Sequence, residues 1–545
     1  MASIYDVGTS ALTSMQRAIA TTGHNIANVN TEGYSRQEVS LSTRNPERVG
    51  AVEIGTGVEV SRIKRAHDQF LMSDVQSRAS SNGYYQLYAS TAQNVDGLLA
   101  DPSTGIAPAI DKFFAAMEAV AANPNSSPER QVMLSEAQML ASRFNYVDGR
   151  LGEYATELNS RMSNMTDEIN ALAGDIAQLN ETITSVGGRS GNLPNDLLDK
   201  RDLAIKNLSE LVRVETSTQD DGALNVMIGR GQRLVIGNSA EVLRIDFPTS
   251  QEGPARLFLS VPSGAESEVT SKLTGGELGG CLDAGAKLIN NTRREIGLLA
   301  AGITGTFNRQ HAEGDDLAGQ PGGAFFAPLE ASVVGSRTNT GLATVTATLT
   351  DEGALVSDGY SVRYEDDGIR LTNMRSGTSE LVAGGLIDLG GFSIDIPEND
   401  PAFLGDTFFI EPTSGAAGRM SVALTDPMEI AAANRDGNVG DNRNILSLIG
   451  LRDAETLKSG SQSYSSLYGA TLSGIAVETR SAQSNAETEQ ILLRSAEDRL
   501  EGLRGVNLDE EATNLIRYQQ AYQAAAQVIT VANDIFDTLL QASRR

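Results

Sequence analysis

The two ends of this chain carry the same kind of hydrophobic pattern, although most of its 545 residues lie between them. Near the N-terminus, apolar residues recur at steps built from three and four, at Leu12, Met15, Ile19 and Ile26. The C-terminal segment repeats this rhythm, at Leu515, Tyr522, Ile529, Phe536 and Leu540. Such spacing places each set on one stripe of an α-helix, as along the seam of a coiled coil. We therefore expect the two ends to pair with each other.

The C-terminal pattern has a second apolar row beside the first, at Ala525, Val528, Ala532, Ile535 and Leu539. A helix that is apolar on two adjacent faces needs more than one packing partner. The terminal stripes are therefore predicted to form an assembly interface between copies of the chain. The alternative is that both ends complete the core of a monomer, and the pattern alone does not exclude it.

Between the ends, helical and extended patterns alternate. Apolar residues at steps of three and four predict a long helix from Leu134 to Val186. The period changes to two between Val212 and Leu273, which is typical of β-strands. A second strand zone runs from Ala343 to Leu424, and Asp367-Gly368 within it predicts a hairpin. This second zone is interpreted as an immunoglobulin-like or related β-sandwich.

These patterns predict a multidomain, mainly α fold with β inserts. It would combine a terminal α-helical coiled-coil trunk, a long helical middle domain and an immunoglobulin-like or β-sandwich insert. The expected units, in chain order, are an N-terminal axial helix (1–35), the N-terminal part of a trunk domain (36–100), a helical domain (101–330) with a β insert near 212–280, a β-sandwich-like domain (331–427), the C-terminal part of the trunk domain (428–505) and a C-terminal axial helix (506–545) that pairs with the first.

Composition argues against several classes of partner. The formal net charge is −27, and an acidic surface repels nucleic-acid phosphates and anionic lipids. We expect no membrane insertion, because no stretch approaches the roughly 18 apolar residues of a membrane span. We also expect no cleavable secretion signal, because the first residues lack a basic segment followed by an apolar one. The chain is then cytoplasmic, or exported by a route that leaves its N-terminus uncut.

Residues that could carry catalysis or bind a metal are few and scattered. The histidines, His24, His67 and His311, lie in no metal-binding or catalytic spacing, and Cys281 is a lone cysteine. The loop at 436–442 has calcium-like oxygen donors but lacks the register of a calcium-binding loop. We therefore expect no metal, no cofactor and no enzymatic activity, and leave open whether this loop binds a cation.

Two terminal strings resemble signatures of a known family. GHNIANVNTEGYSRQ, residues 23–37, resembles the N-terminal signature of the bacterial flagellar axial proteins, which form the rod, the hook and the hook-associated structures. LDEEATNLIRYQQAYQAAAQVITVANDIFDTLL, residues 508–540, resembles their C-terminal signature. The chain looks most like the members found at the hook–filament junction. By the motif match, the residues that shape the turn below the first helix are Asn25, Asn28, Asn30, Gly33, Tyr34 and Arg36.

The resemblance implies a structural adaptor that joins hook to filament. Copies would form a self-assembling ring between the hook protein and a second junction protein, after export by the flagellar type III system. A cytoplasmic export chaperone would first cover the C-terminal helix, where Leu515, Tyr522, Ile529 and Phe536 would carry subunit and chaperone contacts. The location would be the extracellular flagellum, preceded by a transient cytoplasmic state.

Two alternatives stay open on the sequence. One is another axial protein of the same family, in the hook or the distal rod. The other is a secreted enzyme carried on an axial scaffold. The enzyme would need a nucleophile or metal-binding group in its β inserts, and the sequence shows no motif for either.

Overall fold

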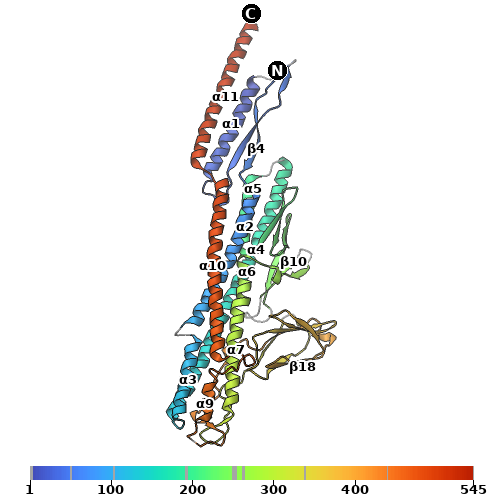
Figure 1. Ribbon diagram of the computed structural model, residues 1–545. Helices are drawn as coiled ribbons and strands as arrows, with labels where there is room; N and C mark the ends of the chain where they lie inside the picture. Colours follow the sequence, from blue (N-terminus) through green and yellow to red (C-terminus); the bar gives the residue numbers. More distant parts are fainter. Residues whose placement is uncertain are drawn as a thin grey trace.

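The structure, a computed structural model, describes residues 4–49, 52–101, 105–190, 194–247, 255–260, 264–336, 339–438 and 440–543. The molecule is elongated, with helices along its length, β lobes to one side, and both chain ends at the same tip (Figure 1). Among the described residues, no helix combines the length and the apolar character that crossing a membrane requires.

A helical body forms most of the length of the molecule, and α10 runs beside α2 along it (Figure 1). Its helices are α2 (Gln69–Ala100), α3 (Ile106–Ala122), α4 (Ser127–Ser190), α5 (Asn195–Leu211), α6 (Gly276–Asp283), α7 (Asn291–His311), α8 (Ala416–Arg419), α9 (Arg443–Gly450) and α10 (Tyr464–Arg504), with a π-helical turn η2 (Ala284–Asn290) and the 3-10 turns η1 (Thr270–Lys272), η3 (Pro401–Phe403) and η4 (Pro427–Glu429).

The long helix predicted from Leu134 to Val186 is confirmed as part of α4, which has 64 residues. Its apolar stripe faces the core, because Leu140, Phe144 and Leu151 are fully buried. Asn180 joins α4 to the β-strand region that follows α5. Its Nδ2 donates to Leu224 O at 2.8 Å and to Gly237 O at 2.6 Å. The fold is therefore largely helical around α4, α2 and α10.

The first β lobe consists of a four-stranded and a three-stranded antiparallel sheet, with orders β5-β6-β7-β8 and β11-β10-β9. Their strands are β5 (Val214–Thr218), β6 (Leu224–Ile228), β7 (Gln232–Ile236), β8 (Ser239–Ala240), β9 (Val242–Asp246), β10 (Arg256–Ser260) and β11 (Glu266–Glu268).

The second β lobe consists of a five-stranded and a three-stranded sheet, with orders β13-β20-β15-β16-β17 and β14-β19-β18. The predicted hairpin is confirmed, because Glu365 pairs with Gly368 at the turn between β15 and β16. The immunoglobulin-like identity of this lobe stays a prediction. Its strands are β13 (Ser332–Gly335), β14 (Thr346–Leu349), β15 (Tyr360–Glu365), β16 (Gly368–Asn373), β17 (Ser379–Val382), β18 (Gly385–Asp388), β19 (Phe392–Ile396) and β20 (Thr407–Glu411). A separate short pair joins β12 (Gly314–Asp315) to β21 (Ala433–Asn434).

The tip that carries both chain ends is called the terminal unit here. It consists of α1 (Ile4–Ala27), the paired strands β1 (Gln37–Thr43) and β4 (Val58–Arg65), the short strands β2 (Glu47–Val49) and β3 (Val52–Ile54), and α11 (Leu508–Ser543). Helix α1 packs against α11 and against the β1–β4 pair. Figure 1 shows α1 and α11 beside each other beyond the end of the helical body.

Hydrophobic burial is concentrated in the body. One large core cluster runs through the helices and β lobes, and a second, small cluster of Met72, Val75, Ala496 and Leu500 joins α2 to α10. Within the described part of the chain, neither cluster includes a residue of the terminal unit. The tip therefore adds nothing to the hydrophobic core of the body.

A buried ion pair joins two helices of the body. The Nε and Nη2 atoms of Arg293 on α7 donate to the two carboxylate oxygens of Asp148 on α4, each at 3.0 Å. The two side chains are only 8% and 9% exposed. Because neither charge can turn to water, each depends on the other for compensation.

A fully buried histidine makes the stability of the body sensitive to pH. Nδ1 of His311 lies 2.8 Å from Gly323 O, and its Nε2 accepts from the backbone N–H of Ala431 at 2.8 Å. The ring is therefore neutral, with its proton on Nδ1. Burial lowers the pKa of His311 from 6.5 to about 4.

We expect His311 to destabilise the fold as the pH falls from about 6.5 to about 4. In that pH range His311 is protonated in the unfolded chain but stays neutral in the folded chain, so the stabilisation present above pH 6.5 is lost. The loss attributable to His311 should reach about 3 kcal/mol. Urea unfolding of the wild type and of His311→Gln at pH 7 and pH 4 would measure it as the difference between the two pH dependences. Equal dependences would contradict the expectation.

Candidate assembly interface and its polar joint

At the contact between α1 and α11, a glycine of α1 meets a large residue of α11. Gly8 on α1 is buried, as are Ala525 and Ala532 on α11. A Cβ atom at Gly8 would lie 2.6 Å from Cγ1 of Ile529, too close for any larger residue without a shift. The absence of a side chain at Gly8 thus allows the two helices to approach closely there.

The large apolar residues predicted as the interface differ in how far one chain buries them. Four residues of α1 and two of α11 are half-buried: Leu12, Met15, Ile19, Ile26, Leu515 and Ile529. Tyr522, Phe536 and Leu540 are 39%, 56% and 42% exposed. Within one chain, Ile529 of the predicted stripe lies directly against Gly8 of α1. Whether the predicted residues bind other copies stays a prediction.

Helix α11 exposes further apolar side chains. Val528 and Ile535 of the second predicted row are 41% and 45% exposed, and Ile516 and Val531, which neither row included, are 55% and 54% exposed. By contrast, the buried apolar residues of the terminal unit, among those the structure describes, are the three alanines Ala18, Ala525 and Ala532. Burial in one chain thus leaves most of the apolar surface of α11 in contact with water.

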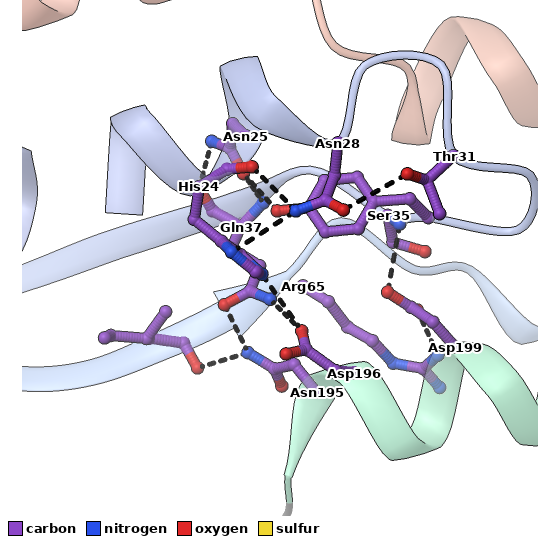
Figure 2. Close-up of polar contacts among 12 residues, drawn as sticks. His24, Asn25, Asn28, Thr31, Ser35, Gln37, Arg65, Asn195, Asp196 and Asp199 are labelled. Atoms are coloured by element: carbon purple, nitrogen blue, oxygen red, sulfur yellow. Dashed lines mark hydrogen bonds and ion pairs between the residues drawn. The ribbon is translucent and has the colours of Figure 1, made fainter. Parts of the chain in front are cut away.

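The turn after α1 is built around the side chain of Asn25, which is 1% exposed. Its Oδ1 accepts from the Tyr34 hydroxyl at 2.7 Å and from the Gln37 N–H at 2.9 Å, and its Nδ2 donates to Gln37 O at 2.9 Å (Figure 2). Burial beside acidic groups raises the pKa of Tyr34 well above its usual range, so the hydroxyl keeps its proton. Asn25 therefore fixes the path of the chain from α1 into β1.

The other predicted turn residues have different roles. Asn28 Nδ2 donates to His24 O at 3.0 Å, and its Oδ1 accepts from the Thr31 hydroxyl at 3.1 Å (Figure 2). Gly33 has φ +78°, and a Cβ atom there would lie 3.1 Å from Cβ of Leu203 on α5. Glycine is required at this position by conformation and by space. Asn30 is exposed.

Three carboxylates on α5 bind the terminal unit from below. Asp196 accepts from Gln37 Nε2 at 2.8 Å, and Asp199 accepts from the Ser35 N–H at 3.0 Å and from Arg65 at 2.9 Å (Figure 2). Asp202 accepts from Arg65 at 2.6 Å. The sequence analysis missed these residues. The spacing of three between the aspartates was the available signal, since it places them along one face of a helix.

Arg36 joins the turn to the break between α10 and α11. Its backbone N–H donates to Arg504 O at 2.9 Å, and its Nη1 binds Glu510 at 2.9 Å. Asn507 caps α11, because its Oδ1 accepts from the Asp509 N–H at 3.0 Å. Together these bonds form a polar joint, which we define as Asn25, the turn at residues 28–37 and their partners on α5 and around residue 507.

Alanine in place of Asn25 is expected to loosen the joint without unfolding the body. The change leaves the buried N–H and C=O of Gln37 and the Tyr34 hydroxyl without their hydrogen-bond partner, which costs about 1–3 kcal/mol of stability. Amide exchange at Gln37 should then accelerate by roughly 10- to 100-fold. Asn30→Ala is the matched control, because Asn30 is exposed, and unchanged exchange in both variants would contradict the role given to Asn25.

In the structure, residues of the candidate cation loop at 436–442 make hydrogen bonds to other residues of the chain. Asp441 accepts from Arg443 Nη2 at 2.8 Å and from the Asn434 N–H at 3.1 Å, and Arg443 holds the pKa of Asp441 well below its usual range. Asp436 donates its N–H to Asp315. Among the residues described, no three His, Cys, Asp or Glu side chains are grouped so that they could hold a metal ion, and Val439 in this loop lies outside them.

Family models match three parts of the chain. Residues 6–34 match the flagella basal body rod protein, and residues 504–542 match the C-terminal part of the flagellar basal body rod FlgEFG proteins. Residues 92–326 match the helical domain of flagellar hook-associated protein FlgK. Rod-type ends that pair at the tip of a long helical body define the chain as a flagellar axial protein.

Similarity to whole proteins is more specific. Flagellar hook-associated protein 1 of Escherichia coli (strain K12) is 31% identical over 549 residues, which cover 99% of this chain and 100% of that protein. The protein of the same name from Bacillus subtilis (strain 168) is 26% identical, over 97% of this chain and 96% of its own. The flagellar hook junction protein FlgK from Burkholderia pseudomallei has a similar fold, with a TM-score of 0.71 at 21% identity over 78% of this chain and 99% of that one.

The chain belongs to the flagellar hook-associated protein 1 family, also called FlgK. It is thus a flagellar component of the hook–filament junction type, and the related proteins are structural parts of the flagellum.

Proposed function

We propose that the chain is a structural adaptor that joins hook to filament by assembling into a ring of copies, without catalytic activity. The observation that carries this proposal is the terminal unit, whose described residues form no hydrophobic core cluster yet expose apolar side chains along α11. Helices of this kind are stabilised mainly by packing. Neighbouring copies would supply the missing surface.

Neighbouring copies suit this surface because the required faces lie together at one tip of each molecule (Figure 1). Leu12 and Ile19 on α1 are half-buried, whereas Val531 and Phe536 on α11 are mostly exposed. Fully burying one such large side chain stabilises an assembly by about 1.5–3 kcal/mol. Paired α1 and α11 helices, the axial units 1–35 and 506–545, would therefore form the inner coiled-coil tube of the ring. The trunk domain (36–100 with 428–505), the helical domain (101–330) and the β-sandwich-like domain (331–427) would lie outside this tube.

The proposal includes three further partners, as the family resemblance implies. The ring would contact the hook protein on one side and the second junction protein on the other. Before export by the flagellar type III system, a cytoplasmic chaperone would cover the apolar face of α11 in a groove, a known mode of helix recognition. The chaperone before export and the neighbouring copies after it would need the same face at different times, which agrees with the exposure of Ile516, Val531 and Phe536.

Removal of residues 516–545 tests the proposal in cells that lack the native copy of the gene. We expect hooks to remain, filaments to be absent and flagellin to appear in the medium. The purified truncated chain should keep the melting temperature of the helical body, because α11 contributes no residue to the described core clusters. Normal filaments would overturn the proposal, and an unfolded body would show that α11 serves the monomer instead.

A further inference from the structure

A cavity of about 210 Å³ lies where α2, α5 and β5 meet, on the body side of the polar joint. Its apolar lining is Met72, Leu198, Ile205 and Leu224. It is smaller than the roughly 300–1,000 Å³ of most sites for drug-sized ligands, but it is large enough for a small molecule or ion.

The polar lining comes from two facing elements. Gln69, Ser73 and Gln76 on α2 are four and three residues apart and so share one helix face. Thr216 and Thr218 are two apart on β5 and share one strand face. Gln76 is only 7% exposed, although it is polar. These amide and hydroxyl groups line the same cavity, and each can donate a hydrogen bond.

Arg201 contributes a positive charge to the cavity lining, and its hydrogen-bond partners do not neutralise that charge. The side chain is 5% exposed, and its Nη1 donates to two neutral acceptors, Asn180 Oδ1 at 2.9 Å and Gly222 O at 2.8 Å. Its buried Nε has no hydrogen-bond acceptor in the described part of the chain. Because both acceptors of Nη1 are neutral, no carboxylate is hydrogen-bonded to the guanidinium in the described part of the chain, and an anion beside it would be stabilised.

The acidic group at the cavity is already occupied. Asp202 lines it, but Asp202 Oδ2 accepts from Arg65 Nη1 at 2.6 Å and lies 3.6 Å from Nδ1 of His67. Arg65 also binds Asp199, so its charge is shared by two carboxylates. Arg201 is therefore the cationic group left to bind a ligand from the cavity.

We propose that this cavity binds a small oxyanion, such as inorganic phosphate, between Arg201 and the hydroxyl and amide groups of α2 and β5. An acceptor-rich anion complements a lining made of donors, and guanidinium groups bind oxyanions with charge-assisted hydrogen bonds. The ligand would tie α2, α5 and β5 together directly below the joint. This site is separate from the assembly interface and does not depend on the proposed junction role.

The test uses the purified full-length chain, titrated with sodium phosphate at constant ionic strength against sodium chloride. Isothermal titration should show saturable binding, and the melting temperature should rise with the same concentration dependence. Sulfate and acetate arms distinguish a general oxyanion site from one that requires phosphate or accepts a carboxylate. Because phosphate and sulfate also stabilise proteins by exclusion from their surfaces, the readout is the difference between variants.

Arg201→Gln should weaken phosphate binding about tenfold or more, since it removes a charge-assisted contact. If this variant does not fold, the double variant Ser73→Ala with Thr216→Val keeps the bonds of Arg201 and should weaken binding as well. Ser77→Ala is the matched control, one turn from Ser73 on α2 and outside the cavity lining. The absence of saturable binding, or equal shifts in wild type and double variant, would show that the cavity holds only water and overturn the proposal.

Discussion

Asparagine in place of Asp148 is expected to lower the free energy of unfolding of the helical body by about 3–5 kcal/mol. The reason is that Arg293 would keep its charge in a site where its partner carboxylate is 9% exposed and water cannot replace that partner. The two hydrogen bonds of 3.0 Å join α4 to α7, so the variant should unfold at a lower denaturant concentration with the same cooperativity. Circular dichroism during urea unfolding measures both quantities.

The control for this prediction removes both charges. Asp148→Leu combined with Arg293→Met should recover most of the loss, because a buried ion pair often contributes little beyond apolar residues of similar volume. A single variant as stable as the wild type would contradict the prediction. A double variant no better than the single one would show that packing around α4 and α7, and not charge compensation, determines the cost.

Serine at four exposed apolar positions of α11 is expected to abolish filament attachment while leaving the monomer folded. The positions are Ile516, Val531, Ile535 and Phe536, each between 45% and 56% exposed in the single chain. If copies bury them, the lost stabilisation is about 1.5–3 kcal/mol per side chain, so assembly should weaken by at least about a hundredfold. Electron microscopy of cells that express the variant would count filaments per hook.

The matched control replaces polar residues on the same helix. Gln519, Gln523 and Gln527 are exposed, and serine at these positions should leave filaments intact. Equal melting temperatures of the two purified variants would show that any difference arises in assembly. Filaments in normal number on cells with the apolar variant would contradict an assembly role for this face, as would equal losses in both variants.

The long helices could be predicted from the sequence because their stability depends on a local pattern. In α4 the residues at steps of three and four, such as Leu140, Phe144 and Leu151, are the residues that the core buries. The start of α11 was equally readable, since Asn507 is followed by an acidic first turn and caps the helix. These features depend on neighbours in sequence, and the sequence therefore contains them directly.

The contact between the ends could not be predicted in the same way. Gly8 carries no hydrophobic signal, yet it lies directly against Ile529 of α11, because a residue without a side chain lets the helices approach there. The pairing of Arg65 with Asp199, 134 residues later, leaves no local pattern at all. The sequence predicted that α1 and α11 belong together, whereas which faces meet depends on shape.

The polar joint has a mechanical consequence. The hydrogen bonds from the Ser35 and Arg36 N–H groups to Asp199 and Arg504 O, which join the tip to the body, can be exchanged for bonds to solvent at a small net cost, whereas apolar groups of a packed core cannot. A load applied along the molecule should thus bend it first at the polar joint. The helical body would stay rigid while the terminal unit tilts relative to it.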